Sequence, residues 1–192
     1  YLGMSGIGHS CERKSWMDWR WVSQVRFRAD TLKRFADGHH GEDVQADRLR
    51  MVDGITLLTV NPENGRQWGV SDIDGHFKGH MDGAILGLLQ APKTWHVWEH
   101  KQVEEKKQAK LEKLKAEKGE KQALAAWDAT YYAQAILYMH YSGMDRHYLT
   151  CATPGGRRTI SVRTEANTED ALRLIAKAER IITSVEPPAG VS

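Results

Sequence analysis

Two apolar, strand-like segments of this 192-residue chain carry ionisable residues in their interior. The first reads Gly79-His80-Met81-Asp82-Gly83, and the second reads Trp98-Glu99-His100-Lys101-Gln102. Because residues two apart on a strand face the same side, Glu99 and Lys101 are expected to point together. A buried acid and a buried lysine are costly unless something compensates their charge. This requirement constrains both the fold and the chemistry of the chain.

A divalent metal would compensate the acids, because Mg²⁺ and Mn²⁺ prefer carboxylates, backbone carbonyls and waters as ligands. Asp82 and Glu99 are the predicted metal ligands, together with the backbone carbonyl of Gln102 or of His100. Two such metals ~3.5–4 Å apart stabilise the attacking and leaving oxygens of a phosphodiester, and Lys101 would hold or polarise the attacking water. The competing interpretation is a salt bridge between Glu99 and Lys101 on an exposed edge strand, which a short Glu-x-Lys pattern taken alone favours.

The apolar pattern predicts a group of helices, then a β-meander, and then further helices and strands. The expected helices cover residues 11–37, 40–51, 104–122, 123–141 and 168–183, with a break at Asp37-Gly38. The expected strands cover residues 55–60, 66–70, 76–88, 95–103, 148–152 and 159–162, with a hairpin turn at 72–75. This order predicts a single α/β domain over residues 1–192, in which helices flank a mixed central β-sheet. Because segment 104–122 has few apolar residues, a charged and solvated helix is expected there, broken or softened at Gly119.

The composition is that of a globular protein, with 41% hydrophobic and 27% charged residues. No apolar run approaches the ~20 residues of a membrane-spanning helix, so no membrane role is expected. The sequence does not open on a basic-then-apolar leader, which favours a cytoplasmic location. The two cysteines, Cys11 and Cys151, could pair in principle, but two thiols are favoured because no secretion signal accompanies them. Two cysteines alone also do not supply the four ligands of an iron–sulfur cluster.

Histidines and tryptophans offer further interpretations. Four histidines fall on predicted strands at spacings that suggest zinc, namely His76, His80, His96 and His100. No Cys-x-x-Cys or His-Glu-x-x-His pattern accompanies them, so zinc is less favoured than magnesium. The tryptophans Trp16, Trp19 and Trp21 would stack on unpaired bases or pack in the core, and core packing is favoured for at least two of them.

Basic residues gather between Arg13 and Arg34 and again after Lys101, although the net charge is only +2. This distribution fits an acidic metal pocket inside a positive groove, while charge alone favours an ordinary solvated surface. The hypothesis is that the helix after Lys101 lies over the cleft and guides a DNA strand, through Lys106, Lys107 and Lys110. Arg13, next to a predicted turn, is the best candidate for gripping a DNA phosphate.

Three further features strengthen the functional interpretation of the Glu-x-Lys pattern. Asp82 lies 17 positions before Glu99, on the preceding predicted strand. The segment Gly38-His39-His40-Gly41-Glu42 places a carboxylate near the start of a helix. Gln134 and Tyr138 are four residues apart on the helix after the sheet, so they face one way. In this order the motifs resemble the PD-(D/E)XK nuclease superfamily, and within it the RecB-like and phage-exonuclease branch.

The resemblance spans roughly residues 4–150 and implies a restriction-endonuclease-like core. It implies that Glu42, Asp82 and Glu99 hold metal, and that Lys101 assists the water. It also implies that Gln134 and Tyr138 orient Lys101 or the DNA backbone. The opening segment 4–13 is similar to the Ser…Cys-x-Arg segment of that branch, which implies DNA contacts by Ser5 and Arg13. Many members carry four cysteines for an iron–sulfur cluster, but here the C-terminal three are absent, so no cluster is expected.

These inferences predict a DNA nuclease that depends on Mg²⁺ or Mn²⁺. The resemblance favours an exonuclease of phage or bacterial recombination or repair, with DNA as its partner and a recombination or helicase protein as a further one. Two alternatives stay open. An inactive DNA-binding module of the same fold would bind DNA without divalent-dependent cleavage. A different metal-dependent phosphohydrolase would turn over small phosphate esters and ignore DNA.

Overall fold

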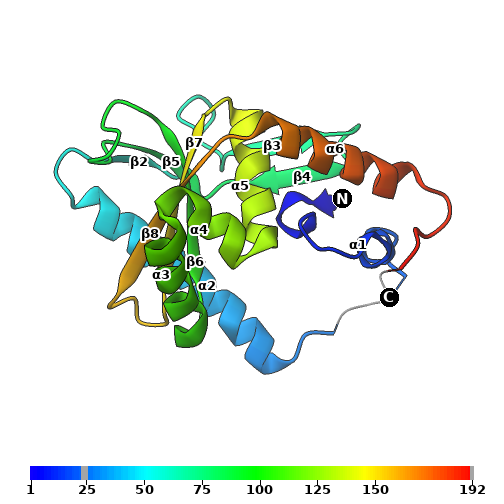
Figure 1. The fold of residues 1–192 in the computed structure, drawn as a ribbon, viewed down its shortest axis with the longest axis horizontal. Helices are drawn as coiled ribbons and strands as arrows, with labels where there is room; N and C mark the ends of the chain where they lie inside the picture. Colours follow the sequence, from blue (N-terminus) through cyan, green and yellow to red (C-terminus); the bar gives the residue numbers. More distant parts are fainter. Residues whose placement is uncertain (23–25, 191–192) are drawn as a thin grey trace.

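The computed structural model describes residues 1–22 and 26–190, and its main feature is a mixed five-stranded sheet (Figure 1). The strand order is β2 (Thr56–Leu58), β5 (Gly83–Leu86), β6 (His96–Gln102), β7 (Arg146–Ala152) and β8 (Thr159–Glu165). Strands β6 and β7 pair in parallel, and the other neighbours pair antiparallel. The predicted α/β class with a mixed sheet flanked by helices is therefore confirmed.

A second, three-stranded sheet has the order β1 (Leu2–Gly3), β4 (Phe77–His80) and β3 (Gly69–Asp72). The predicted hairpin turn joins β3 to β4, where Ile73 and Asp74 have positive φ angles of 49° and 52°. The single strand expected over 76–88 is wrong, because β4 ends at His80 and β5 begins at Gly83 in the other sheet. The chain passes from one sheet to the other at Met81. Its N–H donates to Trp68 O, which lies just before β3.

Helices α1 (Glu12–Trp19) and α2 (Ala29–Arg50) replace the two helices expected at the N-terminus. The predicted break at Asp37-Gly38 is wrong, because α2 runs through both residues. A Cβ at Gly38 would meet nothing within 4 Å, so the glycine costs only helix propensity there. The chain leaves the helical path earlier, at Trp21, whose φ is 55°. Residues 23–25 of the first expected helix lie outside the described residues.

Helices cover both faces of the five-stranded sheet. Ala46 and Leu49 of α2 pack with Leu57, Ile85 and Trp98 on one face. The other face is covered by α3 (Glu105–Lys118), α4 (Glu120–Trp127) and α5 (Ala129–Ser142). Helix α6 (Thr168–Thr183) packs beside α5 and α1, at the right of Figure 1. Among the described residues, no helix is both long and apolar enough to span a membrane.

The charged segment after β6 differs from the solvated helix that its composition suggests. Leu111 of α3 is fully buried, and the buried Gln108 amide donates to Cys151 O and Arg158 O. These contacts attach α3 to β7 and β8, so the expectation of a merely solvated helix is wrong. The predicted interruption at Gly119 is confirmed, because Gly119 has a φ of 82° and separates α3 from α4.

The aromatic residues of the N-terminal segment divide as the sequence predicts. Trp16 and Trp19 pack against the core cluster built on α5 and α6, and Trp16 Nε1 donates to Ser184 O. Trp21 is 78% exposed. Core packing of two of the three tryptophans is therefore confirmed. Cys11 and Cys151 are not joined by a disulfide.

Candidate active site

Strand β6 presents Glu99 and Lys101 side by side, as the period of a strand predicts. Lys101 Nζ lies 2.8 Å from Glu99 Oε2, and the Glu99 residue is 1% exposed. Strand β6 lies between β5 and β7, so the pair sits on an interior strand. The Glu-x-Lys pattern is therefore not the exposed edge-strand salt bridge of the competing interpretation.

Asp82 reaches this pair from the point where the chain passes from β4 to β5. Its Oδ2 accepts a hydrogen bond of 2.8 Å from the backbone N–H of His100. Its own backbone N–H faces Glu99 Oε1 at 3.4 Å. The antiparallel register, in which Gly83 faces Trp98, brings the two acidic residues together across the ladder. The break between the two sheets thus places Asp82 beside Glu99.

Glu42 approaches from α2 and lines a cleft of about 440 Å³ together with Asp82 and Lys101. Helix α2 comes very close to β6 here, because a Cβ on Gly41 would lie only 2.1 Å from Gln102 Oε1. Only glycine permits this approach without a shift of the neighbouring side chain. Packing therefore requires a glycine at position 41, one residue before Glu42, whereas Gly38, the glycine of the Gly-x-x-x-Glu pattern, has open space at its Cβ position.

The carboxylates of Glu42, Asp82 and Glu99 all interact electrostatically with one ammonium group, that of Lys101. Burial, and then Asp82, raise the pKa of Glu99 to about 8, although Lys101 acts to lower it. Burial and Asp82 likewise raise the pKa of Glu42 to about 7. Burial also raises the pKa of Asp82 above its ordinary value. Burial acts to lower the pKa of Lys101, but Glu99 and Asp82 raise it overall. The cluster therefore holds more carboxylates than its cation compensates.

The residues present fit a divalent cation by their chemistry, although they are not arranged as a closed metal cage. Within the ranges 1–22 and 26–190, no group of three or more His, Cys, Asp or Glu side chains is placed to hold a metal. Lys101 Nζ donates a hydrogen bond to Glu99 Oε2, and the His100 N–H donates one to Asp82 Oδ2. The candidate ligands are carboxylate oxygens whose negative charge exceeds that of the nearby ammonium group. Such ligands suit Mg²⁺ or Mn²⁺ better than zinc.

Gln134 and Tyr138 lie on α5, one turn apart, and Gln134 Nε2 donates to Tyr138 Oη at 3.2 Å. The same hydroxyl oxygen accepts the backbone N–H of His80 at 3.1 Å. Burial, and then Glu99, raise the pKa of Tyr138 to about 12, so this buried phenol stays neutral. The pair thus supports the end of β4, two residues before Asp82. The role expected for it, orienting Lys101 or the DNA backbone, stays a prediction.

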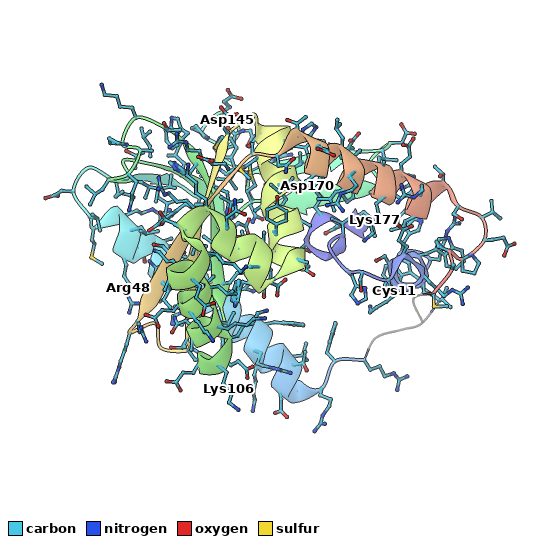
Figure 2. The ribbon with its side chains drawn as sticks, viewed as in Figure 1. Cys11, Arg48, Lys106, Asp145, Asp170 and Lys177 are labelled. Atoms are coloured by element: carbon cyan, nitrogen blue, oxygen red, sulfur yellow. The ribbon has the colours of Figure 1, made fainter. Side chains whose placement is uncertain are left out.

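The residues predicted to touch DNA lie apart from one another. Ser5 is exposed on a short 3-10 turn (Met4–Gly6), and the exposed Arg13 donates to Pro188 O. Neither residue lines the cleft of Glu42 and Asp82. Lys107 pairs with Asp128 at 2.7 Å and lies over the Tyr131 ring. Lys106, labelled in Figure 2, and Lys110 are exposed on α3.

Sequence reasoning missed several residues of the site. Arg34 and Phe35 of α2 line the cleft, and Lys101 Nζ lies 5.5 Å from the centre of the Tyr131 ring. His39 also lines the cleft; the sequence offers it as a metal or phosphate ligand but favours a surface position at the helix entry. Tyr131 is three residues before Gln134 on the same helix, so helical spacing was a usable signal. Thr150 donates to Glu99 O from the neighbouring strand β7. No local pattern reveals that contact, because it depends on the register of β6 with β7.

No family model and no curated protein matches the sequence, whereas solved structures match the fold. The chain shares its fold with these structures, at sequence identities of 13% to 14%. The alkaline exonuclease LHK-Exo from Laribacter hongkongensis matches with a TM-score of 0.61 and 13% identity, over 94% of this chain and 85% of that one. Its complex with dAMP matches with a TM-score of 0.62 and 14% identity over the same shares. The structure of SSO0001 matches with a TM-score of 0.55 and 14% identity, over 97% of this chain and 77% of that one.

Proposed function

We propose that this protein is a divalent-metal-dependent DNA nuclease. One observation carries the proposal: Asp82, just before β5, meets the buried Glu99–Lys101 pair of β6 at a cleft that Glu42 also lines. The fold supports the proposal, because solved nucleases share it. An exonuclease is favoured over an endonuclease, because two of the matching structures are of an alkaline exonuclease. A role in recombination or repair, beside a recombination or helicase partner in the cytoplasm, extends the same proposal.

Asp82 and Glu99 would hold Mg²⁺ or Mn²⁺, with the backbone carbonyl of His100 or Gln102 and with Glu42 from across the cleft. A bound divalent ion supplies Lewis-acid stabilisation of phosphate oxygens and lowers the pKa of a bound water. Lys101 keeps its proton at Nζ, since two carboxylates raise its pKa. That ammonium orients the attacking water and offsets charge on the phosphodiester.

The decisive test combines cleavage with metal binding. End-labelled single-stranded and double-stranded DNA should be degraded with Mg²⁺ or Mn²⁺ and left intact with EDTA. Mn²⁺ without DNA should raise the melting temperature of the protein, because a ligand that binds only the folded state stabilises it. Asp82→Asn should lose both responses. Binding of DNA without divalent-dependent cleavage would indicate an inactive module, and turnover of small phosphate esters alone would indicate another phosphohydrolase.

We further propose that α3 guides the DNA strand through Lys106 and Lys110, one helical turn apart. Changing both residues to glutamine should reduce the slope of log affinity against log salt by about 2, because each phosphate contact contributes ~0.9. The change should leave the melting temperature unaltered, because both side chains are exposed. A matched double variant, Arg66→Gln with Lys93→Gln, removes the same charge at two exposed positions outside α3. Equal slopes for the two double variants would eliminate this role of α3.

A further inference from the structure

A groove lies between α6, the first turns of α5 and the N-terminal segment 8–12, outside the candidate active site. It has a volume of about 380 Å³. Its walls include side chains from all three segments, namely Ser10, Ala129, Ala133, Arg173, Lys177 and Arg180. We call this hollow the α6 groove (Lys177 is labelled in Figure 2). It shares no lining residue with the cleft of Glu42 and Asp82.

The basic residues of the α6 groove form a row along one side of α6. Arg173, Lys177 and Arg180 are separated by four and then three residues, so the helix turns them to the same side. Because a helix rises about 1.5 Å per residue, the row extends over ~10 Å along its axis. Among the described residues that line the groove, Glu12 is the only acid. The walls therefore carry more positive than negative charge.

Ion pairs at the rim hold both arginines in place. Arg180 lies 2.9 Å from Glu12 of α1, and Arg173 lies 2.6 Å from Asp170, one turn earlier on α6. Each acid contacts one edge of its guanidinium, which has five N–H donors in total. Because such side chains are already oriented, they lose less conformational entropy when an anion binds. The two arginines are thus available to a further acceptor.

Lys177 has a different environment from the two arginines, since its partners are uncharged. Its Nζ donates to Ile7 O at 2.8 Å and to His9 O at 2.5 Å. Backbone carbonyls orient the ammonium group without neutralising its charge. Burial lowers the pKa of Lys177; Glu12 acts to raise it, whereas the two arginines lower it further. The middle of the row is therefore a place where an anion would be stabilised.

A polyanion matches this row better than a single small anion does. The three cations follow one another along the helix axis instead of converging on one point. A nucleic-acid strand carries one phosphate per nucleotide, so its charges also follow one another along a line. Leu174 and Ala133 add apolar surface to the walls, against which the sugars or bases of a strand can pack.

The α6 groove is close to the candidate active site along the chain of α5. Ala129 lines the groove, while Tyr131, two residues later, has its ring centre 5.5 Å from Lys101 Nζ. Gly8 brings the N-terminal segment against this part of α5, because a Cβ there would lie only 2.5 Å from Thr130 Cα. The groove and the active-site lysine thus contact residues of the same helical turn.

We propose that the α6 groove binds the phosphate backbone of the DNA strand on which the candidate active site acts. The proposal rests on the proposed nuclease function, because that function places a DNA strand in the neighbouring cleft. Arg173 and Arg180 each contact one phosphate, and Lys177 lies between them. Contacts to the backbone carry no base preference, so the groove positions the strand without selecting its sequence.

The test measures how the affinity for single-stranded DNA depends on salt, by fluorescence anisotropy in EDTA. Arg173→Gln with Arg180→Gln should reduce the slope of log affinity against log salt by about 1.4, because each phosphate contact on a single strand contributes ~0.7. Arg66→Gln with Arg157→Gln removes the same charge at exposed positions outside the groove and should retain the parent slope. Equal slopes for the two double variants, or no DNA binding by the parent protein, would overturn the proposal.

A charge-conserving variant separates the effect of charge from that of folding. Arg173→Lys with Arg180→Lys keeps both cations and should retain the parent slope. The ion pairs of both arginines are largely exposed and contribute little to stability, so every double variant should melt close to the parent protein. A slope reduced as much by the lysine variant as by the glutamine variant would contradict an electrostatic role of the row.

An acidic protein segment is the competing occupant, and labelled poly-aspartate tests it. If the glutamine variant loses binding of poly-aspartate while its DNA slope is unchanged, the groove is a protein-binding site and the proposal fails. The inference and the nuclease proposal also fail separately. Cleavage of DNA with equal slopes would remove only the inference, and a reduced slope without any cleavage would remove only the nuclease proposal.

Discussion

Lys101→Met is expected to slow metal-dependent DNA cleavage by about 10²–10³-fold, the usual loss when one group that stabilises a developing charge is removed. Methionine preserves most of the packing of the lysine stem beneath the Tyr131 ring while it deletes the ammonium. Initial rates on end-labelled DNA, with Mg²⁺ at saturation, measure the effect. A rate equal to that of the parent protein would show that the site lies elsewhere.

A control separates loss of chemistry from loss of structure in this experiment. Lys93→Met removes the same charge from an exposed loop position just before β6 and should leave the rate unchanged. The Lys101→Met protein retains a buried Glu99, whose raised pKa of about 8 lets it take up a proton at neutral pH. The double variant Glu99→Gln with Lys101→Met removes the buried acid together with its partner, so it should be at least as stable as Lys101→Met, but it should stay inactive.

Gly87→Ala is expected to destabilise the fold by about 2–4 kcal/mol, because it combines backbone strain with overpacking. Gly87 follows β5 and has a φ of 96°, in the region that favours glycine. A Cβ there would lie 1.8 Å from the carbonyl oxygen of Gly54, just before β2. The neighbour is backbone, so a side-chain rotation cannot relieve the contact. Urea unfolding followed by circular dichroism measures the change.

Gly38→Ala provides the opposite expectation at a glycine without these constraints. Gly38 lies inside α2, its φ is not positive, and a Cβ would meet nothing within 4 Å. Alanine should therefore stabilise the protein by ~1 kcal/mol through helix propensity alone. If Gly38→Ala and Gly87→Ala lower the free energy of unfolding by the same amount, the close contact between Gly87 and Gly54 has no effect of its own on stability.

Local sequence patterns predicted the structure correctly where a feature depends on a single helix, strand or turn. The alternation of Glu99 and Lys101 on β6, the hairpin turn at Ile73-Asp74 and the interruption at Gly119 all follow from backbone periods and turn chemistry. They were less reliable where packing overrides propensity. Gly38 did not break α2, because helix packing beyond it outweighs one unfavourable residue. Leu111 and Gln108 attach α3 to the sheet, although its composition suggests a solvated helix.

The amino-acid sequence by itself determined which chemical groups are available and in what order: a carboxylate ahead of the meander, another before a strand, and a Glu-x-Lys pair on the next strand. Only the tertiary structure decided that the strand over 76–88 divides between two sheets and that Asp82 thereby reaches Glu99. It also decided that the basic residues of α6 line a groove beside the first turn of α5. The physical reason is that these contacts depend on strand register and helix approach between segments far apart in the chain, which no local period encodes.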